Sequence, residues 1–306
     1  FRFLSHPGGK PGSEHNPQHP LYPLFCSGDR LDIVCQCLIQ QNVPVLGAVQ
    51  LLGICRKADK EEVQRRAFFA AMRINVEVKT SLINFNEFEE FFEPFLKEGK
   101  DLLYIGMSSG ISSTFNNAEM AAEELREAYP DRKIELVDTK NASLGEGLPV
   151  LRAYAMRDEG KDIETVAEAL RDLVPRMRGS FMVDDIMYLK HTGRVSGVVA
   201  VAGKALGIRP LLRGDDDGHI VQAGKSRGKK AALNALLDDF NAHVLPDSHQ
   251  QVAVAHCDDE ESAQYMAEKM LENPAVDDVI IEWYESVTGS HLGPGAVAIF
   301  YEADHR

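Results

Sequence analysis

The chain has 306 residues, of which 44% are hydrophobic, and this is enough to bury one large core or two smaller ones. Its formal net charge of -14 argues against binding to nucleic acid or to anionic membrane surfaces, because an acidic surface repels phosphate groups. No apolar run approaches the roughly 20 residues that cross a bilayer, so no integral membrane segment is expected.

The amino terminus and the cysteine content favour a cytoplasmic protein. The first residues lack the apolar stretch of a signal peptide. Five cysteines are present without a Cys-x-x-Cys pair, and we interpret them as reduced thiols rather than a disulfide framework. The spacing of Cys35 and Cys37 with His15 and His19 matches no zinc module, so no metal site is predicted. No cofactor is expected either.

The predicted elements begin after a polar start. Residues 1–23 are rich in Pro, Gly and His and are expected to be a poorly ordered tail or a cloning-derived segment. Residues 31–54 support no assignment, and residues 60–72 predict a helix. From residue 102 onward strands alternate with helices. The predicted strands cover 102–107, 133–137, 181–183, 208–212, 219–223, 251–256, 279–283 and 296–301, and the helices cover 114–129, 146–157, 163–177, 197–206, 227–243 and 260–272.

This alternation predicts an α/β fold with a mainly parallel sheet. A polar segment near Met177–Ser180 suggests two domains, residues 24–178 and residues 179–306. The acidic string Asp215–Gly218 lacks the ligand spacing of a calcium loop, so we interpret it as a hairpin turn between two strands.

A serine-rich loop follows the first predicted strand of this alternation. Hydroxyl side chains occupy five of the seven positions that end at the predicted helix start: Ser108, Ser109, Ser112, Ser113 and Thr114. Free backbone N–H groups and hydroxyls at a helix start can bind an anion. Helix capping needs only one of these hydroxyls, so the number favours an anion site over capping alone.

Two further segments are weaker candidates when each is taken alone. The pair Thr80-Ser81 has the composition of an ordinary turn. The segment Gly289–Gly295 contains His291 and is predicted to be a loop, since Gly and Pro force a special backbone path. A single loop His is more often solvated or structurally bonded than functional.

Taken in order, these segments resemble the DegV family of bacterial lipid-binding proteins from about residue 60 to residue 301. The resemblance rests on the following strings: Thr80-Ser81, Ser108–Thr114, Val137-Asp138-Thr139, Ser143–Gly147, Gly193–Ser196, Ile208–Leu212, Gly224–Ala231 and His291–Ala296. The first strand of the family, with its Asp-Ser-Thr-x-Asp-like turn, has no clear match, and Cys26–Asp29 is the nearest string.

The resemblance implies a two-domain α/β fold, with a mainly parallel sheet in the amino-terminal domain and a mixed α/β carboxyl-terminal domain. A long-chain fatty acid would lie between the domains. Carried over to this sequence, the residues that hold its carboxylate are Thr80, Ser81, Ser108, Ser109 and His291.

The family resemblance also implies a partner. Some DegV proteins are the non-catalytic binding subunit of a fatty acid kinase, and a separate ATP-binding subunit converts the bound lipid to an acyl phosphate. Arg194 and Arg227 are candidate contacts for such a partner or for its phosphates, although a basic helix start is more often simply solvated.

Two other functions remain open at this point. Residues 106–110 satisfy the Gly-x-Ser-x-Gly pattern, and Ser108, Asp258 and His291 follow the chain order of an α/β-hydrolase triad. DegV proteins also resemble the substrate domain of dihydroxyacetone kinase, which would imply a small hydroxylated substrate. The apolar residues available to line a pocket favour a lipid over that substrate.

Overall fold

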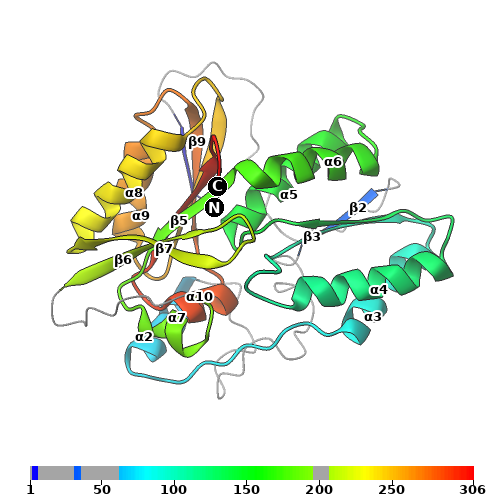
Figure 1. Cartoon of the computed structure of the whole chain (residues 1–306), viewed down its shortest axis with the longest axis horizontal. Coiled ribbons are helices and arrows are strands. Elements are labelled where there is room, and N and C mark those ends of the chain that lie inside the picture. Colours follow the sequence, from blue (N-terminus) through cyan, green and yellow to red (C-terminus); the bar gives the residue numbers. More distant parts are fainter. Residues whose placement is uncertain (1, 6–30, 36–61, 196–206) are drawn as a thin grey trace.

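The computed structural model describes residues 2–5, 31–35, 62–195 and 207–306. These residues form two β-sheets with helices packed around them (Figure 1). A three-stranded sheet has the order β2-β3-β4, and a seven-stranded sheet has the order β1-β9-β8-β10-β5-β6-β7. The strands are β1 (Arg2–Ser5), β2 (Leu31–Cys35), β3 (Asp101–Gly106), β4 (Ile134–Asp138), β5 (Met177–Met182), β6 (Ile208–Gly214), β7 (Ile220–Arg227), β8 (Gln250–His256), β9 (Val276–Trp283) and β10 (Val297–Glu302).

The helices fill the connections between these strands. They are α2 (Glu62–Arg73), α3 (Phe85–Lys97), α4 (Thr114–Ala128), α5 (Leu144–Asp158), α6 (Ile163–Leu173), α7 (Met187–His191), α8 (Lys229–His243), α9 (Glu260–Met270) and α10 (Ser286–Leu292). The predicted helix over 197–206 lies outside the described residues. Among the described residues, no helix combines the length and the apolar content that crossing a bilayer requires.

The strand directions confirm the expected α/β class. In the three-stranded sheet all neighbours are parallel, whereas the seven-stranded sheet is mixed, with β8 and β9 parallel and the other pairs antiparallel. The polar segment over 177–180 that suggested a domain boundary is part of β5, which lies inside the seven-stranded sheet. Within the expected tail, Arg2–Ser5 pair with β9, and residues 6–23 lie outside the described residues.

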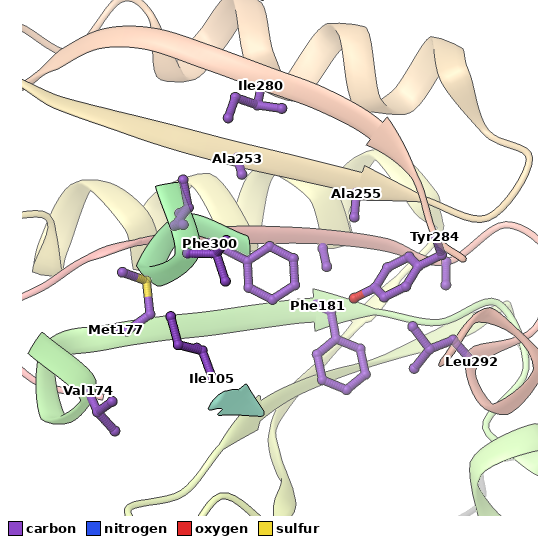
Figure 2. Packing of buried hydrophobic residues seen from close by; sticks show 14 of the residues in the cluster. Ile105, Val174, Met177, Phe181, Ala253, Ala255, Ile280, Tyr284, Leu292 and Phe300 are labelled. Atoms are coloured by element: carbon purple, nitrogen blue, oxygen red, sulfur yellow. The ribbon is translucent and has the colours of Figure 1, made fainter. Parts of the chain in front are cut away.

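One hydrophobic cluster joins the two sheets. Leu103 and Ile105 point from one face of β3 into the same cluster as Phe181 of β5 and Phe300 of β10. Figure 2 shows Ile105, Phe181 and Phe300 gathered in this cluster. Helix α5 contacts strands of both sheets and therefore lies between them. The relative position of the sheets is thus fixed by burial of apolar surface from both.

The opposite faces of the sheets carry separate cores, as the period of two in a strand requires. Leu102 and Tyr104 of β3 pack against Phe88 and Phe92 of α3 and against α4. In the larger sheet, the outer face packs against α8 and α9. Its central strands contribute Val252, Val254, Val297, Ile299 and Tyr301.

Helix α3 was not predicted, although its start carries a clear signal. The Asn84 side chain accepts a hydrogen bond from the backbone of Glu87, and the Glu87 side chain accepts one from the backbone of Asn84. This capping box satisfies two otherwise free donors at the helix start. The many aromatic residues and Pro94 give the segment a low intrinsic helix propensity. The helix is therefore stabilised mainly by the burial of Phe88, Phe92 and Leu96.

A charged network stabilises α8 on the seven-stranded sheet. Asp239 of α8 accepts hydrogen bonds from Arg178 at 2.7 and 3.1 Å and from Ser180 at 3.0 Å, both on β5. Burial alone would raise the pKa of Asp239, but these donors outweigh it and the pKa is lowered. The Arg178 side chain is only 6% exposed, so its permanent positive charge needs Asp239 as a counter-charge.

Asp239→Asn should lower the free energy of unfolding by about 3 kcal/mol, because it leaves the Arg178 guanidinium buried without a counter-charge. Urea denaturation at pH 7 measures this change. Asp277→Asn is the matched control, since Asp277 pairs with His249 in an exposed ion pair and should change stability by less than about 1 kcal/mol. Equal losses in the two variants would contradict the structural role of Asp239.

Candidate functional site

A cavity of about 1040 Å³ lies where segments from both parts of the fold meet. Its walls come from residues 80–91, the loop after β3, the α7 region, the start of β7, and α10. Apolar side chains form much of the wall: Leu82, Ile83, Phe88, Phe91, Met107, Ile111, Leu189, Ile220, Val287 and Leu292. The volume is at the upper end of the range of about 300–1,000 Å³ seen for small-molecule sites.

Five of the residues selected from the sequence line this one cavity. They are Thr80, Ser81, Ser109, Arg194 and His291, which lie far apart in the chain. Ser108 and Arg227 are not among the lining residues. The fold therefore brings most of the candidate carboxylate ligands together, whereas Ser108 and Arg227 lie outside the cavity lining.

His291 lies in the last turn of α10, so the prediction of a loop over Gly289–Gly295 is wrong for its first half. Gly293 follows the last helical residue and has a positive φ of 79°. A side chain at this position would collide with the ring of Tyr188. Both the backbone conformation and the lack of room therefore favour glycine here. The consequence is that a helix, rather than a flexible loop, holds the imidazole in place.

The imidazole of His291 contacts Thr80. His291 Nε2 lies 3.0 Å from Thr80 Oγ1, and this pair joins α10 to the segment between α2 and α3. Within the described part of the chain, the buried Nδ1 of the same ring has no hydrogen-bond partner. Burial and the nearby Arg194 charge lower the pKa of His291 to about 4. The ring is therefore neutral near pH 7, and one of its nitrogens carries a free lone pair.

Ser109 lines the cavity, and it is held by two charged residues at the carboxyl end of β4. Its hydroxyl accepts a hydrogen bond from Lys140 Nζ at 3.0 Å, and its backbone N–H donates to the Asp138 carboxylate at 3.3 Å. Lys140 and Asp138 also form an ion pair of 2.9 Å. Because β3 and β4 are parallel neighbours, their carboxyl ends bring these residues to the serine loop.

Lys140 was not identified from the sequence as a site residue. The signal that could have found it is its place immediately after the Val137-Asp138-Thr139 string, at the carboxyl end of a strand parallel to β3. Ligand sites in open α/β sheets gather at this edge.

Ser108 is completely buried and connects the serine loop to the other sheet. Its hydroxyl donates to the carbonyl of Gly218 at 2.9 Å and accepts from the backbone N–H of Gly110 at 3.1 Å. Gly218 lies in the turn between β6 and β7, where it has a positive φ of 82°. The turn itself confirms the predicted hairpin over residues 215–218, since Asp215 N–H donates to the carbonyl of His219 at 2.9 Å.

Comparison with known proteins decides the family. The family profile described as "Uncharacterised protein, DegV family" matches residues 49–304. The chain belongs to the DegV family.

The DegV relatives cover most of the chain. A DegV domain-containing protein of Clostridium perfringens is 35% identical over 245 residues, which is 80% of this chain and 84% of that protein. A second one, from Lactococcus lactis, is 35% identical over 263 residues, which is 85% of this chain and 91% of the relative.

Solved DegV structures share the fold. A DegV family protein from Thermus thermophilus, described as binding fatty acid, has a TM-score of 0.74 and 28% identity, covering 90% of this chain and 100% of that one. A DegV lipid binding protein from Thermotoga maritima has a TM-score of 0.74 and 25% identity, covering 91% and 100%. The fatty acid kinase B3 protein of Streptococcus pneumoniae, described as loaded with linoleic acid, has a TM-score of 0.73 at 20% identity, covering 90% and 100%, and it shows likeness of fold alone.

Among the described residues, no hydrogen bond joins the members of the alternative hydrolase triad. Ser108 is bonded to Gly218, and His291 is bonded to Thr80. Asp258 forms ion pairs with Arg66 and Arg73 of α2. Helix α4 begins at Thr114, so Ser108 does not lie on a sharp turn directly before a helix as a nucleophile elbow requires.

Arg227 and the basic residues near it lie on another surface of the DegV fold. Arg227 is exposed and ends β7, where it pairs in register with Ile208. Lys229 is partly neutralised by Asp259 at 2.6 Å and by Asp184 at 3.7 Å. Arg194, in contrast, lines the cavity, and its guanidinium donates to the carbonyl of Thr192.

The lowered pKa of His291 predicts a specific pH dependence of stability. The unfolded chain protonates this side chain near pH 6.5, whereas the folded chain does so near pH 4. Between these values the unfolded state binds more protons, so acidification destabilises the folded state. In ligand-free protein, the stability of the wild type relative to His291→Gln should fall by roughly 2 kcal/mol from pH 7 to pH 4.5.

Urea denaturation at both pH values measures this difference. His249→Gln is the control, because His249 is an exposed residue outside the cavity. A wild-type advantage over His291→Gln that stays constant between the two pH values would contradict the burial of a neutral imidazole.

Proposed function

We propose that this DegV chain binds one long-chain fatty acid in the cavity, with the carboxylate at Thr80, Ser109 and His291. The observation that carries the proposal is that a single cavity combines the Thr80–His291 pair with an extended apolar wall. The Thermus thermophilus and Thermotoga maritima relatives, described as binding fatty acid or lipid, support the same ligand class.

The apolar wall supplies the affinity for the hydrocarbon tail. Each buried CH₂ group contributes about 0.8 kcal/mol, so a tail of more than a dozen carbons gains on the order of 10 kcal/mol before the loss of its freedom is subtracted. Side chains from α3, from α7 and from α10 contribute to this wall, including Phe91, Leu189 and Val287. The tail would therefore contact elements from both halves of the chain.

The polar residues fix the carboxylate end. In a neutral His291 that carries its proton on Nε2, the imidazole donates to Thr80 Oγ1, which leaves the Thr80 hydroxyl hydrogen free to donate to the carboxylate. Ser109 offers a second hydroxyl, with its own oxygen held by Lys140. Arg194 supplies a positive charge to the same cavity. A bound carboxylate would also raise the pKa of His291 from its lowered value.

Ser108 has a different role in this proposal from the one that the family resemblance implied. Its hydroxyl is engaged by the carbonyl of Gly218 and the N–H of Gly110, so it positions Ser109 rather than contacting the lipid. Ser81 lines the cavity beside Thr80 and remains a candidate ligand of the carboxylate.

Thr80→Val should weaken fatty acid binding by about 10- to 100-fold, because it removes one hydrogen bond to a charged group and leaves His291 without its partner. Native mass spectrometry of protein purified from cells measures occupancy, and titration of delipidated protein with palmitate measures affinity. Thr165→Val on α6 is the matched control, since Thr165 is exposed and does not line the cavity.

Protein that carries no lipid after purification and binds no palmitate would refute the proposal. Labelling of Ser108 by a fluorophosphonate probe would support the hydrolase instead.

We further propose that the bound carboxylate is presented to a separate ATP-dependent kinase subunit, which forms the acyl phosphate. Support comes from the family resemblance and from the hydroxyl groups at the proposed carboxylate site. Hydroxyl donors stabilise the carboxylate without the full charge neutralisation of a direct lysine contact, and Lys140 is itself paired with Asp138. The oxygen that attacks the γ-phosphate would thereby keep its nucleophilicity.

Presentation to a kinase predicts that the loaded chain forms acyl phosphate only when a partner is present. With ATP alone, hydroxylamine trapping should yield no acyl hydroxamate, and addition of extract from the source cells should yield it. Arg227→Glu should reduce the rate without changing lipid occupancy, because Arg227 is exposed outside the cavity. An unchanged rate in this variant would remove Arg227 from the partner surface.

A further inference from the structure

A second group of potential ligands lies at the far end of α8, outside the lipid cavity. It consists of His243, the last residue of α8, with Asp304 and His305, which follow β10. The backbone holds the two segments together, because Asp304 N–H donates to the carbonyl of His243 at 2.9 Å. Val244 and Ala303 also form an isolated antiparallel bridge. The proximity of these side chains is therefore built into the fold.

The potential ligand atoms converge. Asp304 Oδ1 lies 3.3 Å from His243 Nδ1 and 2.7 Å from His305 Nδ1. One nitrogen or oxygen from each of the three residues lies within 4.8 Å of the other two. The side chains of Asp304 and His305 are 52% and 62% exposed, so both can adjust their rotamers.

A carboxylate behind His243 orients its ring. Asp239, one turn earlier on α8, places Oδ1 3.7 Å from His243 Nε2, and Asp239 is itself held by Arg178 and Ser180. Carboxylates therefore flank both ring nitrogens, and an ion bound at Nδ1 would leave the proton on Nε2, facing Asp239. Nδ1 is buried and faces Asp304.

We propose that His243, Asp304 and His305 bind one divalent transition-metal ion of the zinc class. Two imidazole nitrogens and one carboxylate oxygen suit such an ion, with water as a fourth ligand. Zinc bonds of about 2.0–2.2 Å place tetrahedral ligands roughly 3.4 Å apart. The separation of 3.3 Å between His243 and Asp304 already matches this value, and the 2.7 Å between Asp304 and the exposed His305 would lengthen on binding. Asp239 acts as the outer carboxylate that fixes a ligating histidine. This site is independent of the proposed lipid function.

The ion would tie the end of α8 to the last residues of the chain. Arg306, which follows His305, is 4% exposed and donates to the carbonyl of Lys140 at 2.5 Å. Lys140 in turn holds Ser109 in the serine loop. A bound ion would therefore stabilise the position of Arg306, which in turn supports Lys140 in the loop after β4.

Titration of the untagged full chain with zinc chloride, by calorimetry and by metal analysis after dialysis, tests the proposal. We expect one ion per chain at this site and a rise in Tm that EDTA reverses. His243→Gln and His305→Gln should each weaken this step by more than about tenfold. Because His305 is exposed, its variant should fold normally.

His249→Gln is the matched control, since His249 lies 3.0 Å from Asp277 in an exposed pair that has no third ligand residue among the described residues. Zinc binding that persists in this variant and is lost in His305→Gln supports the site. Absence of zinc binding in the wild type would overturn the proposal, and so would an equal loss of binding in His249→Gln and His305→Gln.

Discussion

The apolar cluster between the two sheets is the constraint on which the candidate site depends. Ile105 at the end of β3 and Phe181 of β5 are buried in the same cluster, and α5 lies between the sheets that carry them. Because protein interiors are close-packed, this cluster fixes how the carboxyl end of β3 faces the β6–β7 hairpin. The Ser108–Gly218 hydrogen bond and the cavity walls both follow from that alignment.

Much of the fold could be predicted because strands and amphipathic helices leave local patterns. The alternation from residue 102 onward was confirmed for most elements, and so was the turn over residues 215–218. Helix α10 could not be predicted in the same way, since Gly289 has low helix propensity. Its place is set by packing, because a Cβ on Gly289 would meet Phe69 and Tyr284. Tertiary contacts of this kind have no local signature.

The residues of the candidate site also fall into those that could be predicted from the sequence and those that could not. Thr80, Ser109 and His291 could be selected because the order of family strings marks them, and the structure places all three on one cavity. The separate role of Ser108 could not be foreseen, because its partner Gly218 lies far away in the sequence. The same holds for Lys140 and for the group at the end of α8, whose members meet only through the pairing of distant segments.

The two sides of the proposed carboxylate site are anchored unequally. Ser109 is attached to both sheets, through β3 and through the bond from its neighbour Ser108 to the hairpin. Thr80 belongs to residues 76–84, which form neither helix nor strand, and Asn117 holds the end of this stretch by a bond to the carbonyl of Ile83 at 2.8 Å. The serine loop is therefore held by strand pairing, whereas the Thr80 segment is held by side-chain hydrogen bonds from His291 and Asn117. A ligand of different length or bend would therefore displace the Thr80 segment more readily than the serine loop, and Ser109 would keep its position beside the carboxylate.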